Sequence, residues 1–333
     1  MELNNYGYIL EKEYTFKKKL KVLTTEQNCH YVLLKVLYCG ICGSDYSCYI
    51  GRRNEYPKSL GHELVAEIIQ TGENVSDFCK GDIVVTDLNY RCGECCFCLS
   101  SKSHLCVQND IELFSNRGFY QYISIHESYL VKLPKTEKLY RYTLIEPLSC
   151  VIHAFDSLSY IPSSILINGC GSIGMLSAFY AKYILGINEI YIRDTISEKE
   201  CLISEHFSLP ILANQSTEKV ECFFECSNTV SGAEYVLNEA QNGALICFMS
   251  HLYGENTSFI YDFECKKELV MVFPLRNGEK KNLLSAHKYI TSLWIDKYDN
   301  IIAIWDYNDI NEVFNKKSTL KTSCKQVLKI TSK

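Results

Sequence analysis

The sequence contains no run of 18 or more apolar residues, which argues against a membrane-spanning helix. Its first six residues lack both the basic region and the apolar segment of a secretory signal peptide, so we expect a cytoplasmic protein. Only 6 prolines and 17 glycines occur in 333 residues, with no low-complexity segment and no internal repeat. These absences indicate a compact globular chain, and its length suggests about two domains.

A strong excess of charge of one sign is also missing. The formal net charge is −5, which provides no general attraction to nucleic acid or to anionic lipid. We therefore expect neither nucleic acid nor a membrane as a partner of this chain.

Cysteine, in contrast, is abundant: the chain has 18, and a group of them lies in the stretch 92–106. Free cysteines are often buried as small hydrophobic side chains, and disulfide frameworks belong mainly to short secreted proteins. The spacing in this stretch is instead typical of a zinc knuckle, in which four thiolates close a tetrahedral shell. The predicted ligands of a structural zinc are Cys92, Cys95, Cys98 and Cys106, with Cys96 as an additional thiol.

A second set of candidate metal ligands lies upstream of this stretch, at Cys42 and at the pair His62-Glu63. A mixed set of thiolate, imidazole and carboxylate groups is typical of a catalytic zinc site with one open position, whereas a four-cysteine shell is closed. One closed site and one open site together predict an enzyme that uses zinc twice.

The pattern of apolar residues changes near residue 150. Before it, the chain contains short apolar runs separated by glycine turns, which favours a small barrel or sandwich. These predicted strands are 31–37, 63–69, 82–86 and 120–125. After it, strands alternate with helices, which predicts a doubly wound parallel sheet of the α/β class. The predicted elements are strands at 164–168, 189–193, 220–225 and 244–249, a helix at 175–185, and a tail with a helix at 283–293 and a strand at 326–330 that we expect to return to the first domain.

A glycine-rich loop joins the first strand of this second region to its helix. It reads Gly169-Cys-Gly171-Ser172-Ile173-Gly174, and Asp194 follows at the end of the next strand. This context predicts a dinucleotide site, because such glycines allow a tight turn, close approach of the pyrophosphate, and close packing of helix on strand. Asp194 would bind the ribose hydroxyls, which favours NAD. The adjacent Arg193 could serve a 2′-phosphate, so NADP is possible.

With these motifs in this order, nearly the whole chain resembles the zinc-dependent medium-chain dehydrogenases, a family that includes alcohol, sorbitol and threonine dehydrogenases. The shared motifs are G-I-C-G-S-D at 40–45, G-H-E at 61–63, G-E-N-V at 72–75, K-G-D at 80–82, the four-cysteine stretch, E-P-L at 146–148 and the glycine loop. The resemblance implies an α/β protein with a GroES-like β-barrel catalytic domain, residues 1–148 completed by 275–333, and a Rossmann domain, residues 149–274. It also implies a homodimer or homotetramer.

Carried over by position, the resemblance gives roles to the residues of the open site. It implies that Cys42 and His62 are zinc ligands and that Glu63 is the third, with Glu146 at the open position. Cys150 is the alternative third ligand, because a cysteine takes that role in the alcohol dehydrogenase branch.

Other positions have implied roles in hydride and proton transfer. Zinc would polarise the substrate hydroxyl for hydride transfer to the nicotinamide, and Ser44 resembles the hydroxyl that starts the proton relay. Many relatives have a histidine five residues after the cysteine ligand, where this chain has Ser47, so the end of the relay is left open. Arg276 resembles an arginine near the nicotinamide. His153 either lies near the cofactor or packs within a helix.

The substrate is indicated by Gly51-Arg52-Arg53, which lies in a loop that borders the substrate cleft in relatives. Two adjacent guanidiniums are suited to bidentate phosphate binding, and the motif resembles ribitol-5-phosphate dehydrogenases; a solvated surface pair is the alternative. We therefore expect a polyol or sugar alcohol as the substrate, with a polyol phosphate as the favoured subclass. The other functions that we consider are a simple alcohol or aldehyde dehydrogenase and a non-catalytic nucleotide-binding relative.

Overall fold

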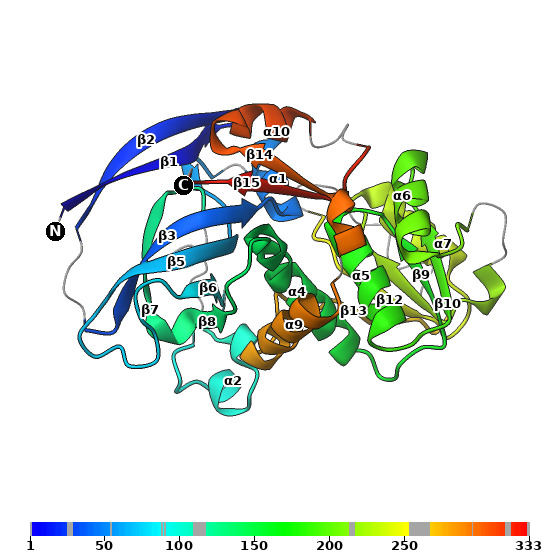
Figure 1. The fold of residues 1–333 in the computed structure, drawn as a ribbon. Helices are drawn as coiled ribbons and strands as arrows, with labels where there is room; N and C mark the ends of the chain where they lie inside the picture. The colour runs from blue at the N-terminus through cyan, green and yellow to red at the C-terminus, as the bar shows by residue number, and fades with distance from the viewer. Residues whose placement is uncertain are drawn as a thin grey trace.

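The computed structural model describes residues 2–24, 29–53, 55–87, 89, 91–108, 118–212, 217–252, 267–294, 296–316 and 321–331. Figure 1 shows an N-terminal half that is rich in antiparallel strands beside a second half with a parallel sheet and flanking helices. None of the helices within these ranges is both long and apolar enough to cross a membrane.

The N-terminal half, which the last two strands of the described chain also join, contains two sheets. The smaller has the strand order β2-β1-β4, and the larger has the order β14-β15-β3-β5-β6-β8, with β7 paired to β3. The strands are β1 (Glu2–Lys12), β2 (Thr15–Thr24), β3 (Tyr31–Gly40), β4 (Lys58–Ser59), β5 (Glu63–Thr71), β6 (Ile83–Thr86), β7 (Tyr122–His126), β8 (Leu130–Leu133), β14 (Ile302–Asp306) and β15 (Lys325–Lys329). Because side chains alternate between the faces of a strand, one face of each sheet supplies a shared core that includes Leu10, Leu34 and Phe119.

The pairing of β3 determines where the open site forms. On one side β3 pairs with β5, so that Gly40 lies opposite Glu63. On the other side it pairs antiparallel with β15, so that Gly40 lies opposite Val327. The segment that leads to Cys42, the segment that follows His62 and the last strand of the chain therefore lie side by side.

The second half is a five-stranded parallel sheet with the order β10-β9-β11-β12-β13. Its strands are β9 (Ser164–Asn168), β10 (Glu189–Arg193), β11 (Cys222–Glu225), β12 (Leu245–Phe248) and β13 (Val270–Val272), and its helices are α5 (Ser172–Tyr183), α6 (Ser197–Phe207) and α7 (Val230–Glu239). All five residues of β9 are buried, as expected for a parallel strand covered on both faces. Because β10 and β11 lie on opposite sides of β9, the strand order reverses there, and open α/β sheets bind their ligands at the carboxyl ends of the strands at such a point.

Two helices join the halves: α4 (Ile145–Asp156) packs against both α5 and α9 (Lys280–Ser292). Leu148 and Val151 of α4 belong to one apolar core that contains Val65 of the antiparallel sheet and Phe224 of the parallel sheet. Within the residues that the structure describes, the remaining α-helices are α1 (Gly43–Tyr49), α2 (Cys96–Leu99) and α10 (Ile310–Lys316). The position of α4 matters most here, because it carries Glu146 and Cys150.

The predicted fold class, a GroES-like barrel with a Rossmann domain, is confirmed, whereas several element ends differ. The helix predicted at 175–185 begins earlier, at Ser172, because the last residues of the glycine loop are already helical. The hairpin β1–β2 was not predicted, since the lysines of β2 hide its alternation of apolar and polar residues. The domain limits at 148 and 275 stay a prediction.

Candidate functional site

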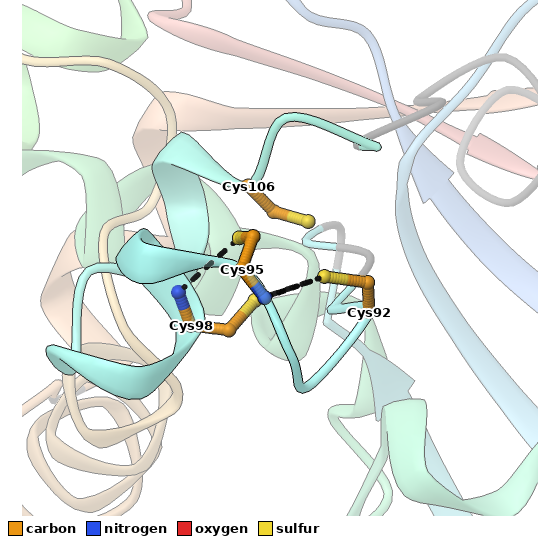
Figure 2. A group of neighbouring side chains, drawn as sticks. All are labelled: Cys92, Cys95, Cys98 and Cys106. Atoms are coloured by element: carbon orange, nitrogen blue, oxygen red, sulfur yellow. Dashed lines mark hydrogen bonds between the residues drawn. The ribbon is translucent and has the colours of Figure 1, made fainter.

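The four cysteines predicted to bind a structural zinc converge, as Figure 2 shows. Each contributes a sulfur, and the four sulfurs all lie within 4.8 Å of one another. Short backbone turns aim the thiols: the N–H of Cys95 donates to the sulfur of Cys92 at 3.3 Å, and that of Cys98 donates to the sulfur of Cys95 at 3.5 Å. We call residues 92–106 the cysteine lobe.

The thiols of the cysteine lobe interact with one another in a way that favours a cation between them. Backbone N–H donors, first that of Cys98, lower the pKa of Cys95. Burial, together with the neighbouring thiols, raises the pKa of Cys98. Four thiolates this close repel one another unless a cation compensates their charge, and a tetrahedral Cys₄ set suits Zn²⁺. The donor set therefore fits the predicted metal.

The cysteine lobe is attached to α9 by Glu279. This carboxylate accepts from the hydroxyl of Ser103 at 2.8 Å and from both the backbone N–H and the ring Nδ1 of His104, at 3.3 and 3.0 Å. Burial opposes ionisation, but the bonds from His104 and Ser103 outweigh it and lower the pKa of Glu279. The lobe is thus fastened by a charged residue that lies far from it in the sequence.

The second predicted ligand set also converges: one ligand atom each of Cys42, His62 and Glu63 lies within 4.8 Å of the other two. We call these three residues the open site. Cys42 caps α1, and its N–H donates to Asp45 at 3.0 Å. The other carboxylate oxygen of Asp45 lies 3.6 Å from Nδ1 of His62. Burial opposes protonation of His62, yet Asp45 and Cys42 outweigh it and raise the pKa of its ring.

Glu63 has a partner that the sequence did not reveal. Its carboxylate accepts a short hydrogen bond from Nζ of Lys325, and both side chains are almost completely buried. The pair lies directly against Gly40, where a Cβ would come within 2.3 Å of the carboxylate and 2.7 Å of the lysine stem. Glycine is therefore required at position 40 for the two strands to bring this ion pair together.

Glu146 lies next to the open site, in the first turn of α4. Burial raises the pKa of its carboxyl to about 7, while His62 opposes the shift and Glu63 adds to it. The thiol of Cys150, one helical turn further along, donates to Glu146 at 3.3 Å. Glu146, which was predicted at the open position, and Cys150, the alternative to Glu63 as third ligand, are therefore in contact, and both metal roles stay predictions. A thiolate, an imidazole and two carboxylates form a donor set that suits Zn²⁺ with one exchangeable position.

The glycine loop has the shape that a pyrophosphate requires. Gly169 has φ +105, and a Cβ there would lie 2.6 Å from the backbone nitrogen of Ser227. A Cβ on Gly174 would collide with the carbonyl oxygen of Gly169, whereas one on Gly171 would meet nothing within 4 Å. That space lies at the N-terminus of α5, where backbone N–H groups face an anion.

Three other predicted cofactor residues lie around this loop. Asp194 accepts from the N–H of Cys170 at 2.6 Å and from that of Ile196 at 2.9 Å, so its carboxylate is fixed just after β10, beside the glycine loop. Arg193 donates to Asn168 at 2.8 Å and stacks 3.7 Å from the centre of the Tyr235 ring. The hydroxyl of Ser172 donates to the carbonyl of Cys324 at 2.9 Å. Cys324 precedes Lys325, so this bond connects the glycine loop to the support of the open site.

The residues predicted to act in proton transfer or beside the nicotinamide lie in two places. Ser44 is on α1 beside Cys42, and the hydroxyl of Ser47 donates to the carbonyl of Gly43 at 3.1 Å. Arg276 donates to the carbonyl of His104 at 3.4 Å, at the cysteine lobe. His153 packs its ring 4.6 Å from that of His104. A role for Arg276 or His153 beside the nicotinamide stays a prediction.

The arginine pair follows α1 and faces the parallel sheet. Nη1 of Arg52 donates to the carbonyl of Asn228, just after β11, at 3.1 Å. Partial burial lowers the pKa of His251, which follows β12, and the charge of Arg53 lowers it further. Both arginines therefore lie near loops at the carboxyl edge of the sheet.

Comparison with known proteins agrees with this geometry. Residues 28–135 match the family model of the alcohol dehydrogenase GroES-like domain. A sorbitol dehydrogenase of Halalkalibacterium halodurans is 26% identical over 303 residues, which are 82% of this chain and 88% of that one. A D-arabitol-phosphate dehydrogenase of Enterococcus avium is 33% identical over 159 residues, less than half of either chain.

The fold is also found among solved structures. The crystal structure of galactitol-1-phosphate dehydrogenase from Escherichia coli superposes with a TM-score of 0.83 over 97% of this chain and 99% of that one. The identity in this superposition is 20%, so it bears on the fold alone.

Proposed function

We propose that the chain acts as a zinc-type medium-chain polyol dehydrogenase, which transfers hydride between NAD and a secondary hydroxyl of a polyol or polyol phosphate. The observation that carries the proposal is the convergence of Cys42, His62 and Glu63 within 4.8 Å. A connected path of contacts links this set to the glycine loop: Glu63 pairs with Lys325, and the adjacent Cys324 accepts from Ser172.

The residues of the open site bind the metal in this proposal, and the residues around them orient these ligands. A zinc ion held by Cys42, His62 and Glu63 would polarise the substrate hydroxyl. Asp45 orients the imidazole of His62, as carboxylates commonly do for metal-binding histidines. Lys325 holds Glu63 in place. Glu146, which lies beside the set in the first turn of α4, would hold the exchangeable position that the substrate takes.

A proton must leave the substrate hydroxyl as hydride departs from its carbon. We infer that Ser44, on α1 two residues after Cys42, accepts that proton through its hydroxyl. The usual histidine beyond it is replaced by Ser47, whose hydroxyl hydrogen is already donated to Gly43. The relay is therefore expected to continue through solvent in the cleft rather than through position 47.

The cofactor is proposed to be NAD. Asp194 lies where a ribose hydroxyl would be bound, and a carboxylate there repels a 2′-phosphate. The guanidinium of Arg193 is directed toward Asn168 and Tyr235, which supports the same choice. If the chain instead prefers NADP in steady-state assays, Arg193 is the residue that reads the phosphate and the assignment of Asp194 is wrong.

The phosphorylated polyols are proposed as the favoured substrates because of Arg52 and Arg53. Both follow α1 and lie near the carboxyl edge of the parallel sheet, because Arg52 donates to the carbonyl of Asn228 and the charge of Arg53 acts on His251. Relatives whose names specify a polyol phosphate, the arabitol-phosphate and galactitol-phosphate enzymes, share the family or the fold. Guanidinium groups bind phosphate through two parallel hydrogen bonds, which supports this choice.

A substrate screen tests the proposal. Polyols, polyol phosphates and simple alcohols are assayed with NAD and with NADP, for the unmodified chain and for Arg53→Ala and Arg53→Lys. We expect Arg53→Ala to lower kcat/KM for a polyol phosphate by about 10- to 100-fold, with little change for the unphosphorylated polyol. Arg53→Lys should recover part of the loss. Equal losses on both substrates would assign Arg53 to support of the loop, and activity on simple alcohols alone would replace the polyol proposal.

We also propose a homodimer or homotetramer. In the described part of the chain, β13 is one of the two edge strands of the parallel sheet, and Val270 and Phe273 at this edge are 45% and 61% exposed. An exposed apolar edge strand is a ready template for pairing with a second copy. Sedimentation of the intact chain tests this, and Val270→Lys should shift any dimer toward monomer.

A further inference from the structure

Three residues connect the two halves of the molecule beside the cofactor crevice. Nη1 of Arg52 donates to the carbonyl of Asn228 at 3.1 Å, and Nδ2 of Asn228 donates to the hydroxyl oxygen of Ser47 at 3.4 Å. Ser47 and Arg52 belong to the N-terminal half, whereas Asn228 follows β11 of the parallel sheet. We call Ser47, Arg52 and Asn228 the interdomain clamp.

In the N-terminal half, the end of α1 fixes the clamp residues relative to each other. The N–H of Gly51 donates to the carbonyl of Cys48 at 3.1 Å, and that of Arg52 donates to the carbonyl of Ser47 at 3.0 Å. With Gly51 at φ +82, these two bonds form a Schellman motif. The hydroxyl hydrogen of Ser47 points to Gly43, so its oxygen is left to accept from Asn228.

In the parallel-sheet half, a tight turn presents Asn228. Its φ is +58, a left-handed conformation that asparagine tolerates better than most residues. The preceding Ser227 donates its N–H to Glu225 at 2.8 Å. Ser227 also packs against Gly169. The clamp therefore rests on the same backbone that supports the first glycine of the dinucleotide loop.

We propose that the interdomain clamp pre-organises the cleft for the dinucleotide. A nucleotide that lies between two halves needs them at one separation, and hydrogen bonds across the cleft favour that separation before the nucleotide binds. Ser47 stands where many relatives have the relay histidine, so in this chain the position holds the two halves together. The inference concerns dinucleotide binding and is independent of which substrate is oxidised.

A double-mutant cycle on dinucleotide affinity tests the clamp, with NADH as the probe, or NADPH if the unmodified chain binds that instead. Ser47→Ala removes the acceptor. Asn228→Gly removes the donor, while glycine retains the left-handed backbone and the carbonyl that binds Arg52. Each change should raise the Kd about three- to tenfold, and the double variant should lose no more than either one, because one bond is lost in all three. Additive losses, or an unchanged Kd, would overturn the proposal.

Arg52 provides a second series. Arg52→Ala should weaken NADH binding, and Arg52→Lys should recover part of the loss because it keeps a donor. Ser231→Ala is the matched control: Ser231 follows the same turn, and its hydroxyl donates to Thr229 within the same half. Affinity for NADH should not change in this control. If Ser231→Ala weakened NADH binding as much as Arg52→Ala does, the loss of affinity would come from general damage to the turn rather than from a lost contact between the two halves.

Amide hydrogen exchange measures the clamp without any nucleotide. In Ser47→Ala, peptides that cover residues 226–229 should exchange faster, although the substitution lies in the other half. Unchanged exchange there would overturn the proposal. Because this measurement needs no catalysis, failure of the clamp is distinguishable from failure of the proposed activity.

Discussion

The cysteine lobe and the open site are both candidate metal-ligand clusters, yet they are built in different ways. All ligands of the cysteine lobe come from one stretch of 15 residues, 92–106, and two of their sulfurs accept from backbone N–H groups in the same stretch. The open site takes Cys42 from the end of β3 and His62-Glu63 from the start of β5, with Lys325 contributed by the last strand. The lobe is local, whereas the open site depends on the whole fold.

The difference has a chemical consequence. A closed shell of four thiolates satisfies the metal and leaves nothing to exchange, so it contributes to folding. A site held by three strands and one helix can keep an exchangeable position because the supports, Asp45 and Lys325, fix the ligands without filling the metal's coordination. Substitutions should therefore affect activity at the open site and stability at the lobe.

The largest effect is expected from two single variants, each of which replaces one cysteine of one cluster. Cys42→Ala should reduce bound zinc from two per chain to one and lower kcat/KM by about a thousandfold or more, because polarisation by the metal contributes several kcal/mol. Cys95→Ser should also remove one zinc, yet it should chiefly lower the thermal stability. Metal analysis, steady-state kinetics and calorimetry distinguish the two variants. If both lost activity and stability alike, the contrast between the clusters would be wrong.

The second prediction concerns the buried ion pair. Lys325→Met leaves the Glu63 carboxylate buried without its cation, which should cost about 3–5 kcal/mol of unfolding free energy. The double variant Lys325→Met with Glu63→Gln should recover much of this stability but not the activity. Urea unfolding after mild chelation measures the stability of the single and the double variant, and steady-state assays of the untreated proteins measure their activity.

Lys316→Met is the control for this pair, because its partner Glu312 is about half exposed and the bond spans one helical turn. Such a surface pair contributes about 0.5 kcal/mol or less. A loss for Lys325→Met no larger than that of the control would show that Glu63 is supported by other groups.

The same contrast explains what could be predicted from sequence. The ligands of the cysteine lobe follow from spacing alone, and the glycine loop follows from a strand, a turn and a helix that are consecutive in the chain. Lys325 could not be predicted, because it lies 262 residues from Glu63 and a single lysine in a strand carries no motif. Asn228 was missed for the same reason. Only the pairing of strands shows which distant side chains meet.

Arg276 shows how a resemblance by position can be incomplete. It is expected near the nicotinamide, its guanidinium donates to the carbonyl of His104 at the cysteine lobe, and the role beside the nicotinamide stays a prediction. Its φ of +59 follows from the local turn, which a comparison of motifs does not capture.

The third prediction tests how the cysteine lobe is fastened to α9. Glu279→Ala removes the acceptor of Ser103 and His104, which should cost about 1–3 kcal/mol. Zinc in the lobe should be released to a chelator faster, with kcat nearly unchanged. Glu94→Ala is the control, since Glu94 is an exposed residue of the lobe itself. If the control also released zinc faster, the rate of zinc release would depend on the charge of the lobe rather than on its bonds to Glu279.

The smallest effect is expected from His153, a residue of α4 whose ring packs against His104 of the cysteine lobe. Burial, and then the neighbouring His104, lowers the pKa of His153 to about 4 from its ordinary 6.5. A depressed histidine pKa means that the fold favours the neutral ring, so its contribution is present above pH 6.5 and is lost as the pH falls toward 4. Allowing for solvent screening, we expect a loss of about 1–2 kcal/mol over this range.

The prediction is measured as a difference between variants. His153→Gln should unfold with a weaker dependence on pH between 6.5 and 4.5 than the unmodified chain, whereas His30→Gln, at an exposed pair with Glu127, should follow the unmodified curve. Zinc is also lost in acid as its ligands are protonated, but that loss is common to all three proteins and cancels. If the unfolding free energy depended on pH in the same way in all three proteins, the contact between His153 and His104 would not make the fold sensitive to acid.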